Sequence, residues 1–138
     1  MSIKYSMDEG AFPIARAHST DAGFDIRSRE AKLVRAGASA IFHPGVHVEI
    51  PHGCCGLIVS KSGLNVNHDI TSTGLIDTSY TGEIVVKLYN NGSEDYMVHA
   101  GDKISQLVIL PCVMEACEQV ESIQGGERGN NGFGSTGR

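Results

Sequence analysis

The chain has 138 residues, of which 41% are hydrophobic and 20% charged, a length and balance typical of one globular domain that folds without disulfide bonds. The net charge of −5 disfavours a general nucleic-acid binder, and no apolar run approaches the roughly 20 residues of a membrane span. The polar N-terminus, which carries Asp8 and Glu9, does not resemble a signal peptide, so we expect a cytoplasmic protein with no membrane or nucleic-acid partner.

Short runs of β-branched and aromatic residues recur along the chain, with hardly any helical periodicity. Turn dipeptides such as Pro44-Gly45 and Asn91-Gly92 separate them, because proline presets φ and glycine supplies a positive φ. One short helix is predicted to begin near Ser62. The predicted strands are residues 22–26, 32–34, 40–42, 46–50, 56–59, 83–89 and 103–110. Many short strands at this spacing indicate an all-β sandwich or barrel.

The cysteines and histidines do not form a recognisable metal-binding pattern. Cys54 and Cys55 are adjacent on a predicted strand, so their side chains point to opposite faces. Reduced thiols are therefore expected at all four cysteines, which include Cys112 and Cys117. His43 and His47 share one strand parity, but a surface role is favoured over a metal site.

The last eleven residues, from Arg128 to the C-terminus, are rich in glycine and cannot build a core. Composition alone favours a disordered terminus. The chemistry is nevertheless specific: Ser135 and Thr136 are hydroxyl donors, Arg128 offers a guanidinium fork for phosphate, and Phe133 offers a flat face to a base. We interpret the segment as a flexible lid that orders around a nucleotide.

Five short blocks of polar residues and glycine punctuate the β sequence, at residues 21–25, 60–64, 74–82, 101–107 and in the tail. Taken singly, each is explained as a turn, a hairpin or a helix cap. In this order and spacing they resemble the trimeric dUTP pyrophosphatase (dUTPase) family, from about Ala22 to the last residue. The tail is the most specific block, and the Gly-Leu-Ile-Asp block with Asp77 and Tyr80 is nearly as specific.

The resemblance implies a jelly-roll-like all-β protein that hydrolyses dUTP to dUMP and pyrophosphate with Mg²⁺. It also implies a homotrimer in which each active site gathers blocks from all three subunits. Within this single domain, we expect the β-rich part to comprise residues 1–121 and a flexible C-terminal arm to comprise residues 122–138. A closed lid over the nucleotide would exclude water from the reaction.

Roles for individual residues also follow from the resemblance. Asp77 matches the carboxylate that orients and deprotonates the attacking water at the α-phosphorus. Tyr80 matches the ring that lies under the deoxyribose and leaves no room for a 2′-hydroxyl. Asp25 matches a carboxylate that acts near the metal, through water. The remaining substrate-binding residues implied are Lys61, Ser62, Gly63, Gln106, Arg128, Phe133, Gly134, Ser135 and Thr136.

Uracil can be recognised by backbone groups of a hairpin, which we place near residues 71–76, including Thr71, Leu75 and Ile76. A tight pocket of this kind excludes thymine by its methyl group and cytosine by its reversed donor pattern.

Three positions depart from the family pattern. Lys61 stands where the family usually has arginine, and a lysine lacks the bidentate fork. Ser79 stands where many members have aspartate, and Thr81 where arginine or glutamine is common. Structural roles also stay open for three of the site residues: Asp77 as a turn residue, Tyr80 as core and Gln106 as a buried strand amide.

Two other functions are compatible with the same fold. A dCTP deaminase-like relative would need a different catalytic glutamate and lacks the Asp77…Tyr80 pattern. A nucleotide-gated switch would use the dUTP-bound state to engage a regulatory protein partner, as some phage-encoded relatives are thought to do. An intact Asp77 argues against a switch that has lost catalysis.

Overall fold

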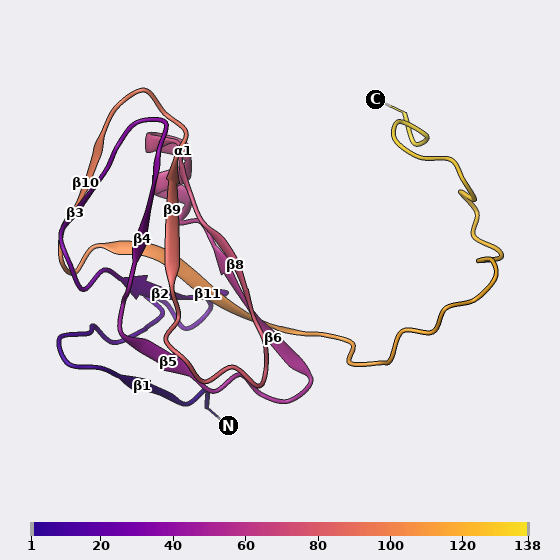
Figure 1. Cartoon of the computed structure of the whole chain (residues 1–138), viewed down its shortest axis with the longest axis horizontal. Coiled ribbons are helices and arrows are strands. Elements are labelled where there is room, and N and C mark those ends of the chain that lie inside the picture. Colours follow the sequence, from indigo (N-terminus) through magenta and orange to yellow (C-terminus); the bar gives the residue numbers. More distant parts are fainter. Residues whose placement is uncertain (1, 138) are drawn as a thin grey trace.

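Residues 2–137, which the computed structural model describes, form an all-β domain with one short helix, as the sequence predicts. The sheets pack together as a compact body from which the C-terminal segment leads away (Figure 1). The elements are β1 Tyr5–Met7, β2 Gly23–Arg27, β3 Lys32–Val34, β4 Ser39–Phe42, β5 Val46–Val48, β6 Cys54–Val59, α1 Ser62–His68, β7 Ile70–Thr71, β8 Thr73–Ile76, β9 Val86–Asn90, β10 Tyr96–Val98 and β11 Lys103–Pro111.

All strand pairs are antiparallel, and β11 is central to the larger sheet. This sheet has the order β2-β11-β6-β8, and a second sheet has the order β4-β9-β7. Two further pairs, β1-β5 and β10-β3, complete the described fold. In β11, Gln106 lies opposite Asp25 of β2 on one side and opposite Val59 of β6 on the other. Blocks distant in sequence are thus brought side by side.

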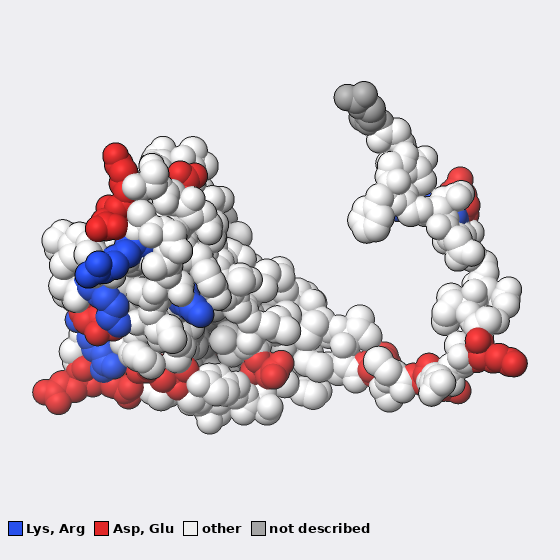
Figure 2. Space-filling model, turned by 45° about the horizontal axis from the view of Figure 1, so that its top comes forward, with Lys and Arg blue, Asp and Glu red and all other residues white. Residues whose placement is uncertain are grey.

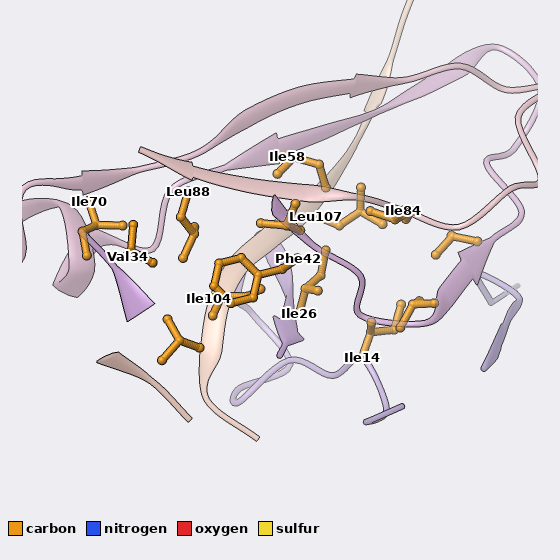
Figure 3. Packing of buried hydrophobic residues seen from close by; sticks show 14 of the residues in the cluster. Ile14, Ile26, Val34, Phe42, Ile58, Ile70, Ile84, Leu88, Ile104 and Leu107 are labelled. Atoms are coloured by element: carbon orange, nitrogen blue, oxygen red, sulfur yellow. The ribbon is translucent and has the colours of Figure 1, made fainter. Parts of the chain in front are cut away.

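The core lies between the sheets, where alternate residues of each strand point inward (Figure 3). In β9, for example, Val86, Leu88 and Asn90 are buried, while Lys87 is half-buried and Tyr89 is exposed. This two-residue alternation is what a strand with one solvated face requires. The largest fully buried side chains are Phe42, Ile26, Ile58, Ile70, Ile84, Leu88, Ile104 and Leu107.

Every predicted strand is present with small shifts at its ends, and the predicted helix is α1. The four short strands β1, β7, β8 and β10 were not predicted as separate elements. The predicted hairpin over residues 71–76 is wrong, because β7 pairs with β9 and β8 pairs with β6 in the other sheet. The chain crosses between the sheets at the buried Ser72, whose hydroxyl lies 2.7 Å from that of Ser105.

Beyond β11 the chain leaves the body. Residues 113–137 are all exposed, including the apolar side chains of Val113, Ile123 and Phe133. Acidic side chains follow one another along the first part of this segment (Figure 2). Arg138, the last residue of the predicted arm, lies outside the described residues. The division at residues 121 and 122 stays a prediction. None of the described residues forms a helix long and apolar enough to cross a membrane.

Candidate active site

Asp77 and Tyr80 line one surface hollow of about 250 Å³ at the end of β8. Asp77 directly follows the last residue of the strand and is exposed. The turn that comes next is anchored to the body, because the Thr78 hydroxyl donates to the carbonyl oxygens of Ile50 and Pro51 at 3.0 and 3.2 Å. The carboxylate is therefore presented to solvent from a fixed backbone.

The ring of Tyr80 forms one wall of this hollow and is 44% exposed, so it is not a core residue. Its hydroxyl donates to the carbonyl oxygen of Glu83 at 2.6 Å. The ring lies so close to Gly82 that a Cβ atom there would be 2.6 Å from the Tyr80 hydroxyl oxygen. A side chain at position 82 would therefore force the Tyr80 ring to move.

A second group of site residues surrounds the Asp25 carboxylate, which is only 7% exposed. One carboxylate oxygen lies 2.5 Å from the Lys61 ammonium and the other 3.0 Å from the Lys103 ammonium. Burial by itself raises the pKa of this carboxyl, but hydrogen bonds and charge attraction from the two lysines outweigh burial and lower the pKa. The cluster has one negative and two positive charges and can attract an anion.

Gln106 and the start of α1 lie beside this lysine pair. The Gln106 amide donates to the Ser60 carbonyl at 3.0 Å, and its oxygen packs so close to Gly23 that a Cβ there would be 2.7 Å away. Ser62 and Gly63 are exposed in the first turn of α1, and Gly63 has open space where a side chain would be. Blocks one, two and four of the sequence therefore meet within one chain.

The two groups lie at opposite ends of the larger sheet. Val59 of β6 is opposite both Gln106 and Thr73, so the lysine pair is at the Thr73 end of β8. Asp77 is four residues farther along, which in an extended strand is about 13 Å. One chain by itself keeps Asp77 away from Lys61 and Gln106.

The segment expected to bind the base, residues 71–76, is divided between the two sheets. Thr71 belongs to β7 in the second sheet, where its hydroxyl accepts from the Asn91 amide at 3.3 Å. Leu75 and Ile76 belong to β8 and line the hollow with Asp77. The structure thus brings Leu75 and Ile76, but not Thr71, to the carboxylate.

The described tail residues, 128–137, make no hydrogen bond or ion pair with these groups. Arg128 donates to the Gly132 carbonyl of its own segment at 2.9 Å, and Phe133 is fully exposed. Gly134, Ser135 and Thr136 are exposed as well, at the far end of the arm (Figure 1).

Sequence reasoning missed several polar residues around the site. Lys103 was not singled out, although it lies in the fourth block. Glu83 directly follows Gly82, the last residue of the third block. Its side chain lines the hollow and pairs with His43 and Arg29. The expected surface role of His43 and His47 is confirmed, but their ion pairs with Glu83 and Asp8 could not be read from spacing.

The donor set is suited to a metal that arrives with a ligand. Within residues 2–137, no three side chains of histidine, cysteine, aspartate or glutamate are placed to hold an ion together. Asp25 is already paired with two ammonium groups. A magnesium ion keeps several waters and binds substrate phosphates, so one carboxylate acting through water fits it, whereas a protein cage does not. The four cysteines are free thiols.

Comparisons with known proteins show which family the chain resembles over most of its length. The dUTPase family profile matches residues 11–137. A deoxyuridine 5′-triphosphate nucleotidohydrolase of Clostridium acetobutylicum is 40% identical over 134 residues, which cover 95% of this chain and 92% of that protein.

Two solved phage structures are also similar. The dUTPase of Staphylococcus bacteriophage 80alpha with dUPNHPP aligns over 99% of both chains with a TM-score of 0.92 and 29% identity, an overlap that includes the arm. A mutant dUTPase of S. aureus phage phi11, described with a structural Mg(II) ion, aligns over 88% of this chain and 98% of that one, with a TM-score of 0.81 and 29% identity.

Proposed function

Because the chain belongs to the dUTPase family, we propose that it hydrolyses dUTP to dUMP and pyrophosphate. The observation that carries the proposal is the hollow in which an exposed carboxylate, Asp77, and a fixed aromatic ring, Tyr80, face the same space. A phosphoric anhydride is cleaved by positioning and charge neutralisation with one base, so this small set of groups is sufficient.

In this proposal Asp77 accepts a proton from the water that attacks the α-phosphorus. Tyr80 lies under the deoxyribose and leaves no room for a 2′-hydroxyl group. The hydrogen bond from its hydroxyl to the Glu83 carbonyl favours this position of the ring. Backbone groups beside Leu75 and Ile76 read the uracil edge. Thr71 lies in β7, before the crossover at Ser72, so it would reach the same base site from the second sheet.

The triphosphate is bound by the lysine pair with Gln106, Ser62 and Gly63. Asp25 fixes the Lys61 ammonium, which compensates in part for the missing arginine fork. Bound Mg²⁺ would neutralise charge on the phosphate oxygens, with Asp25 contacting it through water. Arg128, Ser135 and Thr136 then close on the phosphates, with Gly134 allowing close backbone approach and Phe133 covering the base.

We propose a homotrimer in which subunits share sites, because this brings the two groups and the arm together. Asp77 lies at the other end of the sheet from the lysine pair, and the arm extends away from its own body. Closed three-fold symmetry lets one subunit supply Asp77 and Tyr80, a second the lysine pair, and an arm the lid.

The substrate proposal is tested by assaying pyrophosphate release from dUTP, dTTP, dCTP and UTP, with Mg²⁺ and with a chelator. We expect kcat/KM for dUTP to exceed that for the other nucleotides by about 10²-fold or more, because each competitor loses a contact or clashes. Ammonia release from dCTP is measured in parallel to test the deaminase alternative. Equal rates on all four nucleotides would contradict the proposal.

The shared-site proposal predicts a particle of about three times 14.7 kDa by light scattering. A sharper test mixes two strongly impaired variants, Asp77→Asn and a chain lacking residues 127–138, by co-refolding. We expect the mixture to regain activity, because some sites combine an intact Asp77 with an intact arm from another subunit. An active monomer, or a trimeric mixture that stays inactive, would contradict shared sites.

A regulatory protein partner is a second candidate function. The similar 80alpha protein is described among phage dUTPases that control transfer of virulence genes by a G protein-like mechanism. An arm that is ordered only when a nucleotide is bound would let a partner protein distinguish the bound form of this chain from the free form. Partner binding is compatible with catalysis at Asp77, and both stay proposals for this chain.

A further inference from the structure

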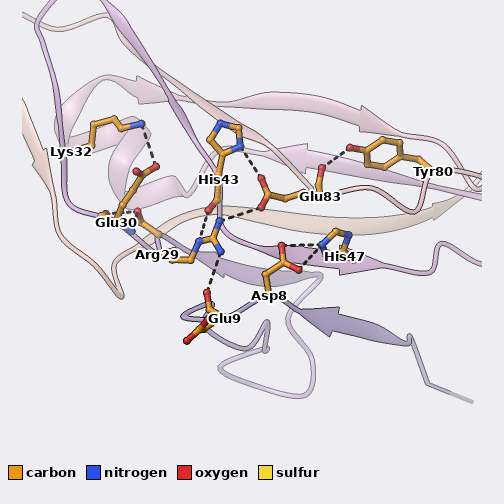
Figure 4. Close-up of polar contacts among 10 residues, drawn as sticks. Asp8, Glu9, Arg29, Glu30, Lys32, His43, His47, Tyr80 and Glu83 are labelled. Carbon is orange, nitrogen blue, oxygen red and sulfur yellow. Dashed lines mark hydrogen bonds and ion pairs between the residues drawn. The ribbon is translucent and has the colours of Figure 1, made fainter.

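The loop that carries Tyr80 is tied to the body by a set of polar contacts (Figure 4). We call residues 78–85 the Tyr80 loop. Its Glu83 carboxylate lies 2.7 Å from the His43 ring and 3.4 Å from the Arg29 guanidinium. Near its end, the Ile84 amide donates to the Val46 carbonyl at 2.8 Å. These contacts fix the second half of the loop.

His47 makes the contact in the middle of the loop, and it uses both ring nitrogens. Nδ1 lies 3.0 Å from the carbonyl oxygen of Thr81, the residue after Tyr80. Nε2 lies 3.1 Å from both carboxylate oxygens of Asp8. A carbonyl and a carboxylate only accept hydrogen bonds, whereas a neutral imidazole donates from one nitrogen alone. Both contacts are therefore satisfied only by the protonated, positively charged ring.

The fold places this ring where three segments meet. β1 pairs with β5 so that Ser6 lies opposite His47, and the Asp8 amide donates to the Gly45 carbonyl at 2.8 Å. Asp8 is thereby fixed just past the end of β1, on the far side of the ring from Thr81. We call Asp8, His47 and the Thr81 carbonyl the His47 clamp.

We propose that the charged His47 is a positioning residue that sets the position of the Tyr80 ring. The inference rests on the proposed role of Tyr80 against the sugar. His47 touches neither the hollow nor Asp77, so it acts through the backbone of Thr81. Protonation of His47 is then linked to the fit of the deoxyribose, and the enzyme recognises its sugar best while the clamp is charged.

The other charged groups near the His47 ring do not oppose its protonation. Lys4, Tyr5 and Glu49 line the adjacent hollow with His47, but Lys4 and Glu49 face each other at 3.7 Å and are largely exposed. From the loop, Glu83 adds a second negative charge, itself paired with His43 and Arg29. The balance around His47 favours its cationic form.

The sign of the pH dependence follows from these contacts. The hydrogen bond to Thr81, and then that to Asp8, raise the pKa of His47 above its ordinary value. The clamp is therefore fully present below the ordinary histidine pKa and is lost as pH rises through the raised value. Sugar recognition should weaken on the alkaline side of that value.

The clamp is tested first without any substrate, by an NMR titration of the labelled full-length protein. We expect the backbone amides of Tyr80, Thr81 and Gly82 to shift with the same midpoint as the His47 ring. Asp8→Asn should lower that midpoint, and His47→Gln should abolish the shift of the amides. His52→Gln is the matched control, because His52 is an exposed turn histidine, and it should change nothing.

The kinetic consequence is tested by measuring kcat and KM for dUTP and for UTP across the same pH range. We expect His47→Gln to raise KM for dUTP by about two- to tenfold, as the loss of one or two hydrogen bonds would, and to remove the pH dependence of KM that follows the His47 midpoint. The preference for dUTP over UTP should fall by a similar factor. Because Asp77 is not in the clamp, kcat should change little.

The two measurements separate this inference from the proposed function. If the chemical shifts of the loop amides do not follow the His47 titration, the clamp is overturned, whatever the activity. A coupled titration with an unchanged KM profile in His47→Gln would overturn its effect on sugar recognition. Absence of dUTP hydrolysis in the wild type would overturn the proposed function, while the NMR result would still decide whether His47 positions the loop.

Discussion

Replacing Asp77 with asparagine will slow dUTP hydrolysis by about 10²–10⁴-fold, the usual contribution of a positioned base. Asparagine keeps the size of the side chain and its tolerance for turn conformations but cannot accept the proton. Asp77 is exposed and contributes nothing to the core, so the fold and the oligomer should be unchanged. Single-turnover pyrophosphate release, calorimetric binding of dUTP and a thermal melt measure these three quantities separately.

Ser79→Ala is the matched control for this experiment. Ser79 is exposed in the same turn, two residues from Asp77, and should leave turnover near the wild-type value. A wild-type rate in Asp77→Asn would remove the carboxylate from the mechanism. Loss of dUTP binding in the same variant would instead indicate that Asp77 contributes to binding in the ground state.

Deleting residues 127–138 will reduce turnover by about 10²-fold or more, because closure of the lid brings cationic and backbone donors to the phosphates and excludes water. The melting temperature and the oligomer should stay nearly the same, since none of the described residues 127–137 is buried. Binding of dUTP should weaken less than turnover falls. Ordering each glycine costs about 1–2 kcal/mol, which offsets much of the contact energy.

Phe133→Ala should give a milder form of the same result. Stacking of a base on an aromatic ring is worth roughly 1–3 kcal/mol, so this one side chain is a sizeable share of closure. Phe133 is fully exposed in the open arm, and its removal costs no packing. Full turnover in the truncated protein would contradict the lid, and a lower melting temperature would mean that the arm also stabilises the body.

The sequence by itself predicted the all-β class, every longer strand and the start of α1. These features are local: strand residues alternate between two faces, and proline and glycine fix the turns between them. The chemical character of the blocks is local as well. Asp77 is a carboxylate and Tyr80 an aromatic ring wherever the fold places them, and the resemblance to the dUTPase family implies their roles.

Only the tertiary structure decided which of these groups meet. Asp25 pairs with Lys61 and Lys103 because β2, β6 and β11 are neighbours in one sheet, although the residues are far apart in sequence. A hairpin is expected near residues 71–76, yet the chain crosses over at the buried Ser72, and β7 and β8 lie in different sheets. Strand pairing is set by long-range burial and register, which a local pattern does not contain.

Strand pairing and register also separate the two ends of the site and bring together the residues of the His47 clamp. Spacing could not reveal that Asp77 lies at the far end of the sheet from Gln106, because strand order is not encoded by any single segment. Nor could it reveal that Asp8 and Thr81 contact opposite nitrogens of one ring, since their distances from His47 along the chain are 39 and 34 residues. The residue types indicate which chemical groups are available, and the packing of the sheets determines which of these groups lie close together.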